Sequence, residues 1–315
     1  MSRSIVCGID GSDESLAAAA VAARLAERLG SVLVLAHAVE EGTTFPYGNE
    51  AELDRHRHRI HAEMTRVFER AACRFGWVDV ADRMLYGEPA DQLARLAAEE
   101  DAALLVVGSR GRGAVKAALL GSVSAAVARA SDRPVVIVPP EARIEDDPQA
   151  GGRSVVVCGV DRSEEANSAA RVAAKLAAAL GLGLLLVHAY APGPALAAAP
   201  APAAAARIDY EAVEPRQRAG ARRMLDRVAQ DIEAGPGVGI RVEAGAPASA
   251  LDRCASAENA ELIVVGTHGR GAVASALLGS TSAEVAASAS RPVVLVPTGA
   301  TFRAEQVGAT QHDRR

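Results

Sequence analysis

The stretch GSRGRGAVKAALLGSVS at residues 108–124 is written again, with few changes, as GTHGRGAVASALLGSTS at residues 266–282. In the first copy it overlaps the apolar run ALLVVGS at 103–109. A short apolar run that ends in glycine is typical of a buried β-strand, and the glycine-rich segment after it indicates a loop that leads into a helix. The repetition indicates that the chain contains two copies of one α/β domain.

Further matching segments extend the repeat over most of the chain. Asp10 aligns with Asp161 at an offset of 151 residues, whereas RPVVIVP at 133–139 aligns with RPVVLVP at 291–297 at an offset of 158. We expect the seven additional residues in the Pro/Ala-rich stretch at 192–206. This composition suits neither a strand nor a helix, so it predicts a surface loop.

The repeat predicts two domains joined by a linker. We expect domain one at residues 1–140, a linker at 141–152, domain two at 153–298 and a C-terminal tail at 299–315. The linker is rich in Pro, Gly and acidic residues. The sequence after Pro297 is polar, so we expect a frayed tail.

Within each copy, short apolar runs alternate with amphipathic segments. Near-continuous apolar strands joined by helices predict a parallel sheet covered on both faces, and right-handed crossovers make that sheet doubly wound. Ligands bind such sheets beyond the carboxyl ends of the strands, where the strand order reverses. In the first copy we expect strands at 3–9, 31–38, 80–87, 103–109 and 134–139, and helices at 14–29, 50–75, 89–99 and about 122–130.

The composition excludes several classes of protein. Of the 315 residues, 50% are hydrophobic but only 3% are aromatic, and the formal net charge is −5. Nucleic-acid surfaces need basic charge or stacking aromatic rings. No apolar run approaches the ~18 residues of a membrane span, and the N-terminal run is too short for a signal peptide. We therefore expect a cytoplasmic protein with small-molecule or protein partners, and neither nucleic acid nor membrane among them.

The cysteines and histidines predict no metal site. Cys7 and Cys158 occupy equivalent positions in apolar runs, so we interpret them as buried structural thiols in a reduced compartment. The chain has no CxxC pair and no Cys/His cluster with metal spacing. His56, His58 and His61 lie in a charged segment without a counterpart in the second copy, which favours a solvated helix face over a metal site.

The repeated stretch has the features of a loop that wraps phosphate groups. Gly108 and Gly111 permit close backbone approach to a ligand, and Gly121 leaves the start of the next helix free of a side chain. Ser122 is then a cap candidate or a phosphate contact at a helix N-terminus that favours anions. Other nucleotide signatures fail, since there is no GxxxxGK[ST] and Lys116 stands where GxGxxG needs its third glycine.

These features together resemble the tandem-domain universal stress protein family, in its ATP-binding branch. The resemblance rests on Asp10 in GIDGS, on His37-Ala38 at a strand end, on G-x2-G-x9-G-[ST] and on PVVIVP, each with a counterpart in the second copy. It covers all but the linker, loop and tail. It implies two five-stranded parallel sheets of order 3-2-1-4-5, of the adenine nucleotide alpha hydrolase-like type. It also implies bound ATP. We expect one ATP per domain, with Mg²⁺ as a possible companion of the phosphates.

The resemblance further implies which residues hold the nucleotide. The acid after the first strand and the main chain after the second strand hold the nucleoside, and the glycine loop with its [ST] holds the phosphates. The implied residues of site one are Gly8, Ile9, Asp10, Ala38, Val107, Gly108, Gly111, Arg112, Gly121, Ser122 and Val123. Those of site two are Gly159, Val160, Asp161, Ala189, Val265, Gly266, Gly269, Arg270, Gly279, Ser280 and Thr281. One departure is that the second copy reads VDRS where the first reads IDGS.

Alternative roles stay open for several of these residues. Asp10 and Asp161 could cap the helix that follows them. His37 and His188 end apolar strands, and we interpret them as packed, hydrogen-bonded side chains rather than general bases. The arginines of the glycine loops, at 110, 112 and 270, are either solvated or neutralise phosphate.

The sequence thus predicts an ATP-binding stress or regulatory protein that acts as a nucleotide-dependent switch or scaffold, with no catalytic residue assigned. The alternative is a slow ATPase or adenine-nucleotide hydrolase at the same sites, although the only candidate acids, Asp10 and Asp161, lie at the nucleoside end. A nucleotide-free scaffold is a third reading, which the intact glycine motifs disfavour. We also expect pairing through the last strands, 134–139 and 292–297, between the domains or in a homodimer.

Overall fold

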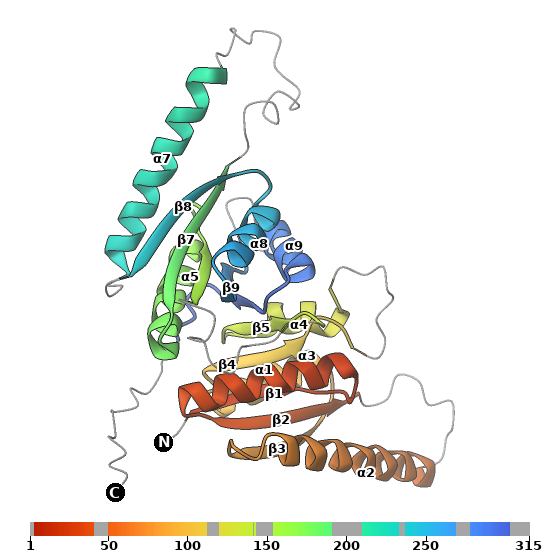
Figure 1. The fold of residues 1–315 in the computed structure, drawn as a ribbon. Helices are drawn as coiled ribbons and strands as arrows, with labels where there is room; N and C mark the ends of the chain where they lie inside the picture. The colour runs from red at the N-terminus through yellow and green to blue at the C-terminus, as the bar shows by residue number, and fades with distance from the viewer. Residues whose placement is uncertain are drawn as a thin grey trace, which may run out of the picture. The chain divides into compact units, whose positions relative to one another are not determined.

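A computed structural model gives the fold of the chain (Figure 1). It describes residues 3–40, 50–111, 120–140, 142, 154–190, 210–232, 237–268 and 278–302, with no side-chain description for 50–54, 56–57 and 210–213. The chain divides into two compact units, of which the first is Met1–Asp146 with Ala300–Arg315 and the second is Asp147–Gly299.

The first unit alternates strands and helices along its whole described length. Its elements are β1 (Ser4–Gly8), α1 (Asp13–Leu29), β2 (Val32–Val39), α2 (Glu50–Arg74), β3 (Val80–Tyr86), α3 (Pro89–Glu99), β4 (Leu104–Gly108), α4 (Ser122–Ala130) and β5 (Val135–Val138). The described strands are all parallel in the order β3-β2-β1-β4-β5, which confirms the predicted order 3-2-1-4-5. This order reverses between β1 and β4, so a ligand site is expected at the carboxyl ends of these two strands.

The second unit repeats the same arrangement. Its described elements are β6 (Val155–Gly159), α5 (Glu164–Leu180), β7 (Gly183–Tyr190), α7 (Tyr210–Asp231), β8 (Val238–Ala244), α8 (Pro247–Ala257), β9 (Ala260–Gly266), α9 (Ser280–Ser288) and β10 (Val293–Val296). Its strands are again parallel, in the order β8-β7-β6-β9-β10. The equivalent reversal point lies between β6 and β9. The predicted loop at 192–206 and most of the predicted linker lie outside the described residues.

Helices cover both faces of each sheet (Figure 1). In the first unit α1 and α2 lie on one face and α3 and α4 on the other, and in the second unit α5 and α7 are opposed to α8 and α9. The strands β1, β4 and β5 are buried almost throughout, because apolar side chains on both strand faces meet a helix layer. The outer strand β3 is half exposed, which explains its less apolar sequence VADRMLY.

Capping side chains and glycines fix the helix that follows the first strand of each unit. The hydroxyl of Ser12 accepts a 3.2 Å hydrogen bond from the backbone N–H of Ser15, and α1 ends at Gly30 in the left-handed region with a φ of 61°. Ser163 caps α5 in the same way, and Gly181 ends it with a φ of 68°. Both helices therefore start at a serine that caps the free N–H groups and end at a glycine that adopts the left-handed conformation.

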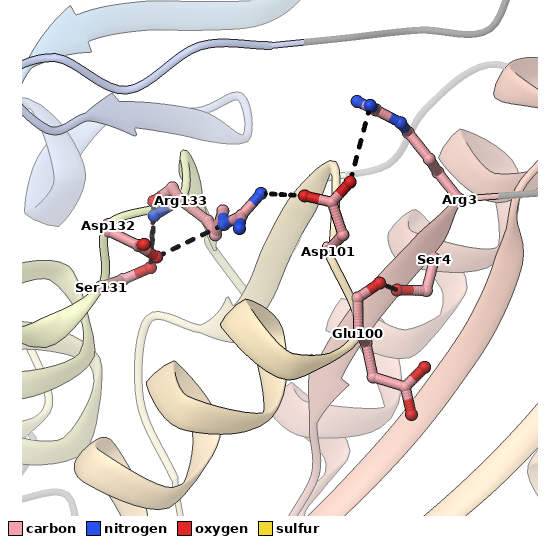
Figure 2. Close-up of polar contacts among 7 residues, drawn as sticks. All are labelled: Arg3, Ser4, Glu100, Asp101, Ser131, Asp132 and Arg133. Atoms are coloured by element: carbon pink, nitrogen blue, oxygen red, sulfur yellow. Dashed lines mark hydrogen bonds and ion pairs between the residues drawn. The ribbon is translucent and has the colours of Figure 1, made fainter.

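A polar cluster joins the amino-terminal ends of strands in the first unit (Figure 2). Arg133 donates from Nη1 to Oδ1 of Asp101 at 2.6 Å, and Nη2 of Arg3 lies 3.6 Å from Oδ2 of Asp101. Asp101 has a φ of 45°, and its counterpart Asn259 has a φ of 48° and accepts a 3.5 Å hydrogen bond from Arg291. Asp and Asn tolerate this left-handed conformation better than other side chains. The cluster lies at the opposite edge from the carboxyl ends, so we interpret it as structural.

The tail is not frayed at its beginning. Phe302 is fully buried, and with Ala300 it belongs to the first compact unit. The prediction of a frayed tail after Pro297 is therefore wrong up to this residue. Transfer of the apolar area of an aromatic ring out of water stabilises the folded state. Residues 303–315 lie outside the described residues.

The buried thiols are confirmed. Cys7 and Cys158 are both 0% exposed, and all four cysteines are free. Burial raises the pKa of both thiols, that of Cys158 to about 12. Among the described helices, none combines the length and the apolar character that a membrane crossing requires.

Candidate functional site

Two loops meet at the carboxyl ends of β1 and β4. The first loop carries Asp10, and the second carries Gly111. Because β1 and β4 are paired in register, with Cys7 opposite Val106, their loops leave the sheet side by side. A Cβ atom at Gly111 would lie 2.6 Å from Oδ2 of Asp10, so a side chain here would displace the carboxylate. The sequence motif and the acid are thus brought together as one site.

The Asp10 carboxylate is oriented by the turn that starts α1. Its Oδ1 accepts hydrogen bonds from the backbone N–H of Ser12 at 2.9 Å and from the Ser12 hydroxyl at 2.5 Å. Ser12 in turn caps the helix, so the alternative role of Asp10 as the cap is wrong. Asp10 holds the cap residue instead, and the signal for this was the serine two residues after the acid.

The second unit keeps this arrangement despite its departure in sequence. Oδ1 of Asp161 accepts from the Ser163 backbone N–H at 2.7 Å and from its hydroxyl at 2.5 Å, and Ser163 caps α5. The preceding residue differs, since Gly11 has a φ of 79° whereas Arg162 is not among the residues with positive φ. Arg162 therefore changes the backbone locally but leaves the position of Asp161 in the turn intact.

The first glycine of each motif permits a close approach between strand and helix. A Cβ at Gly108 would lie 3.2 Å from the carbonyl oxygen of Glu14 and 3.0 Å from that of Arg110. A Cβ at Gly266 would lie 3.2 Å from the carbonyl oxygen of Glu165. Because these neighbours are backbone atoms, a larger residue would force the loop after the strand away from the helix start.

The third glycine is the N-cap residue of the next helix. Gly121 donates its N–H to the carbonyl of Ser109 at 2.8 Å, and no side chain at the cap position bonds to α4. Gly279 does the same toward Thr267 at 2.8 Å at the start of α9. Ser122 is the exposed first helical residue, so its predicted role as a cap is wrong and its role as a ligand contact stays a prediction.

A glycine cap leaves the helix N-terminus open to a ligand. The first N–H groups of an α-helix have no partner within the helix, and together with the helix dipole they favour an anion. Val123 is 38% exposed, so the start of α4 is accessible. The site therefore combines an oriented carboxylate at one end with an anion-binding helix start at the other.

A buried serine that the sequence analysis missed ties each helix start to its strand. The hydroxyl of Ser282 donates to the carbonyl of Gly266 at 2.6 Å, and Ser124 makes the same bond to Gly108. The signal was present in the last letter of both repeated stretches, GSVS and GSTS. These serines stabilise the frame of the loop and do not face solvent.

The histidines at the strand ends are packed and hydrogen-bonded, as interpreted. Nδ1 of His37 lies 2.7 Å from the carbonyl oxygen of Ile9, and Nδ1 of His188 lies 2.7 Å from that of Val160. An Nδ1–H that donates to this carbonyl fixes the end of the second strand against the residue before the acid. Their role is to hold the strand ends, which places Ala38 beside the first loop.

The remaining predicted residues divide into those at the carboxyl edge of the sheet and those that take part in packing. A Cβ at Gly8 would lie 2.8 Å from Leu93, and one at Gly159 would lie 2.9 Å from Leu251, so both glycines admit a helix onto the sheet. Val107 and Val265 are buried core residues. Ile9, Asp10, Ala38, Gly108, Gly111, Gly121, Ser122 and Val123, and their described counterparts Val160, Asp161, Ala189, Gly266, Gly279, Ser280 and Thr281, lie at the carboxyl edge. Arg112, Gly269 and Arg270 lie outside the described residues.

The described charges differ between the two glycine loops. Arg110 is half-buried in the first loop. His268 takes this position in the second loop, with Nδ1 3.1 Å from the hydroxyl of Thr267.

The described His58 and His61 are exposed on α2, in agreement with a solvated face. No group of three or more metal-binding side chains occurs within the described ranges.

An acidic pair lies beside the first site. Glu40 follows β2 and Glu88 precedes α3, so both stand at the carboxyl edge. Slight desolvation raises the pKa of the exposed Glu88, and the neighbouring Glu40 and then Asp91 raise it further.

Comparison with known proteins identifies relatives over nearly the whole chain. The model of the universal stress protein family matches residues 1–139 and 152–297. A universal stress protein of Mycobacterium tuberculosis is 31% identical over 308 residues, which is 92% of this chain and 94% of the relative. One of Mycolicibacterium smegmatis is 30% identical over 301 residues, or 93% and 96% of the two chains.

Solved structures support the same fold. A universal stress protein from Archaeoglobus fulgidus matches with a TM-score of 0.65 and 21% identity, over 95% of this chain and all of that one. At this identity the likeness concerns the fold alone.

Proposed function

Because the chain belongs to the universal stress protein family over both of its units, we propose that it is a cytoplasmic ATP-binding regulatory protein that holds one nucleotide per unit. The observation that carries the proposal is the close approach of the Gly111 backbone to the Asp10 carboxylate, where a Cβ would lie 2.6 Å from Oδ2, next to a helix start capped by glycine. A loop with these features suits a ligand that is a polyol at one end and an anion at the other. A nucleoside triphosphate has this chemistry.

Each part of the site then has a role in binding. The Asp10 carboxylate would accept hydrogen bonds from ribose hydroxyls, and the main chain at Ala38 would contact the base. The backbone of the glycine loop, Ser122 and the N–H groups that start α4 would hold the phosphates. The second unit offers Asp161 and the start of α9 in the same roles.

A metal ion would reach this site with the nucleotide. The described residues hold no group of three ligands that could bind Mg²⁺ by themselves, and Mg²⁺ in nucleotide sites is commonly bound through the phosphates. When bound, Mg²⁺ would neutralise phosphate charge. The residues themselves would supply the N–H groups and the carboxylate.

Binding is favoured over hydrolysis as the function. Phosphoryl transfer needs an acid that holds the metal and a residue that orients water at the phosphate end. Among the described residues the sites offer Asp10 and Asp161, whose Oδ1 atoms are each occupied by two hydrogen bonds from a serine. A slow ATPase at the same sites stays the alternative, and turnover of ATP by the purified protein would establish it.

The direct test is mass spectrometry of ligand released from the purified protein, with calorimetric titration of ATP. We expect adenine nucleotide in the extract and a stoichiometry of two. The double variant Gly121→Pro with Gly279→Pro removes both N–H groups that bond Ser109 and Thr267, so it is expected to abolish binding. Unchanged binding in a folded double variant would overturn the site assignment.

We further propose pairing through the last strand of each unit, β5 and β10, either between units or between copies of the chain. Both strands are short and apolar, and such strands readily pair at a sheet edge. A fragment of residues 1–147 is therefore expected to dimerise. A folded fragment that stays monomeric at high concentration would contradict the pairing.

A further inference from the structure

The two candidate sites differ in charge at the residue after the acid. In the first unit this residue is Gly11, whereas in the second unit it is Arg162, which directly follows Asp161. Arg162 is exposed, and within the described part of the chain it makes neither an ion pair nor a side-chain hydrogen bond. The formal charge of the pair is thus −1 at Asp10-Gly11 and zero at Asp161-Arg162. An exposed guanidinium without a protein partner is available to an anionic group of a ligand.

The direction of the Arg162 side chain follows from its proximity to α7. Its Nη2 lies 4.0 Å from the position of a Cβ at Gly220, which is a residue of α7. α7 packs along β7 and β8 (Figure 1). In the order β8-β7-β6-β9-β10 these strands lie on one side of β6, and β9, which leads into the glycine loop, lies on the other. The guanidinium therefore lies on the side of Asp161 that faces away from β9.

This placement assigns the cation to one end of the ligand. In the proposed binding mode the phosphates lie at the glycine loop and the start of α9, and the nucleoside lies between Asp161 and Ala189. Arg162 is consequently at the nucleoside end, on the opposite side of Asp161 from β9 and the helix start that follows it. At this end the ordinary nucleotide offers only hydroxyls and a neutral base. An anion here must be attached to the ribose.

We propose that Arg162 makes the second site selective for nucleotides that carry a phosphate on the 2′ or 3′ position of the ribose as well as at the 5′ position. The inference rests on the proposed function, because it needs the nucleoside beside Asp161. An acidic side chain accepts free ribose hydroxyls, whereas an added arginine accommodates a ribose phosphate through its fork of N–H donors. The first site, with Gly11, keeps the preference for an unmodified ribose.

The test compares three ligands at the second site of the full-length protein. The variant Gly111→Val blocks the first site, because its side chain displaces the Asp10 carboxylate. AMP, adenosine 2′,5′-bisphosphate and adenosine 3′,5′-bisphosphate are then titrated in competition with ATP. At least one bisphosphate is expected to bind about tenfold more tightly than AMP, the effect of one charge-assisted contact. In the added variant Arg162→Gln the bisphosphate and AMP should bind alike.

Arg171→Gln is the matched control, since Arg171 is an exposed arginine of α5 whose guanidinium bonds Ser168 and not the site. It should leave the preference for the bisphosphate unchanged. Should Arg162→Gln fail to fold, Arg162→Lys keeps the charge without the fork and should retain only part of the preference. A merely structural role for Arg162 would shift the affinities for AMP and bisphosphate together.

The possible results separate the two proposals. Equal binding of AMP and both bisphosphates by the Gly111→Val variant that keeps Arg162, with ATP still bound, would overturn the selectivity. The proposed function would stand. Absence of ATP binding at the second site would overturn both. The same titrations in Asp161→Asn, which weakens the second site, should show no preference for a bisphosphate at the first.

Discussion

The hydroxyl of Ser124 donates a 2.7 Å hydrogen bond to the backbone carbonyl of Gly108, and this bond ties the first turn of α4 to the end of β4. Both partners are buried. The loop between them, which carries the glycine motif, is therefore anchored at its two ends by a single side chain. Ser282 and Gly266 repeat the bond in the second unit.

Ser124→Ala is expected to lower the free energy of unfolding by about 1–3 kcal/mol, because the buried carbonyl of Gly108 loses its donor. ATP affinity at the first site should fall as well, since the loop loses an anchor. Chemical denaturation and calorimetry measure the two effects. Ser288→Ala is the control, because that exposed hydroxyl bonds only within its own helix and its removal should cost less than about 0.5 kcal/mol.

Gly111→Ala should reduce the ATP stoichiometry from two toward one. Its Cβ would lie 2.6 Å from Oδ2 of Asp10, so the carboxylate must leave the position in which the turn holds it. Gly76→Ala tests whether any added methyl has this effect, because a Cβ at Gly76 would have ordinary contacts of 3.6 Å or more. Full two-site binding by folded Gly111→Ala would show that the ligand does not use Asp10.

The two sites are expected to bind ATP unequally. Arg110 carries a guanidinium in the first glycine loop, whereas the second glycine loop has the imidazole of His268 at this position. Arg110→Ala should weaken the first site by about three- to tenfold, and added salt should weaken that site more steeply than the second. Arg129→Ala, at the far end of α4, should change neither. Identical salt dependence of isolated sites would place Arg110 in solvent. Lys116 is a further cation of the first glycine loop, and it lies outside the described residues.

Thiol labelling of the native protein should proceed at Cys73 alone. Cys73 is exposed, whereas the other three cysteines are buried. Burial raises the pKa of the Cys7, Cys158 and Cys254 thiols, so the reactive thiolate is scarce as well as inaccessible. An Ellman titration should therefore count one thiol in buffer and four in denaturant. Fast reaction of a second native thiol would indicate local opening of a strand or helix.

Glu88→Gln should stabilise the fold at pH 7 and not at pH 4. The pKa of the exposed Glu88 is raised in the folded state by slight desolvation and then by Glu40, so the folded state binds the proton more tightly than the unfolded state does. The contribution of Glu88 is fully present below the unfolded pKa and is lost as the pH rises through the folded pKa. Melting curves at both pH values test this. Glu99→Gln, which breaks an exposed pair with Arg95, should give no increase at pH 7.

The regular elements could be predicted because their sequences carry strong local signals. The helix 122–130 and the helix 89–99 were placed at the observed residues, and the strands of the first unit differ by one or two residues at their ends. Apolar runs and a Pro at the first helical position leave little freedom in such elements. The strand order needed the family resemblance in addition.

The details of the site could be predicted less well, because they depend on contacts that sequence spacing does not encode. Asp10 and Ser12 are both good cap residues, and only the fold shows that Ser12 caps while Asp10 bonds to it. Similarly, Ser124 lies two residues beyond the motif, and its bond to Gly108 spans 16 residues. The burial of Phe302 could not be anticipated from a single apolar residue in a polar tail.

The two oxygens of the Asp10 carboxylate have different surroundings, since Oδ1 bonds to the turn before α1 and Oδ2 lies beside Gly111. One belongs to the turn that begins α1, so a descendant that had lost its ligand would still gain from an acid at this position. Gly111 differs, since its φ is not in the left-handed region and the atoms that a Cβ there would meet belong to the Asp10 carboxylate. Among diverged copies of this domain, the presence of this aspartate therefore does not by itself indicate ligand binding. Loss of the glycine at position 111 is the better indicator that a copy of this domain no longer binds its ligand.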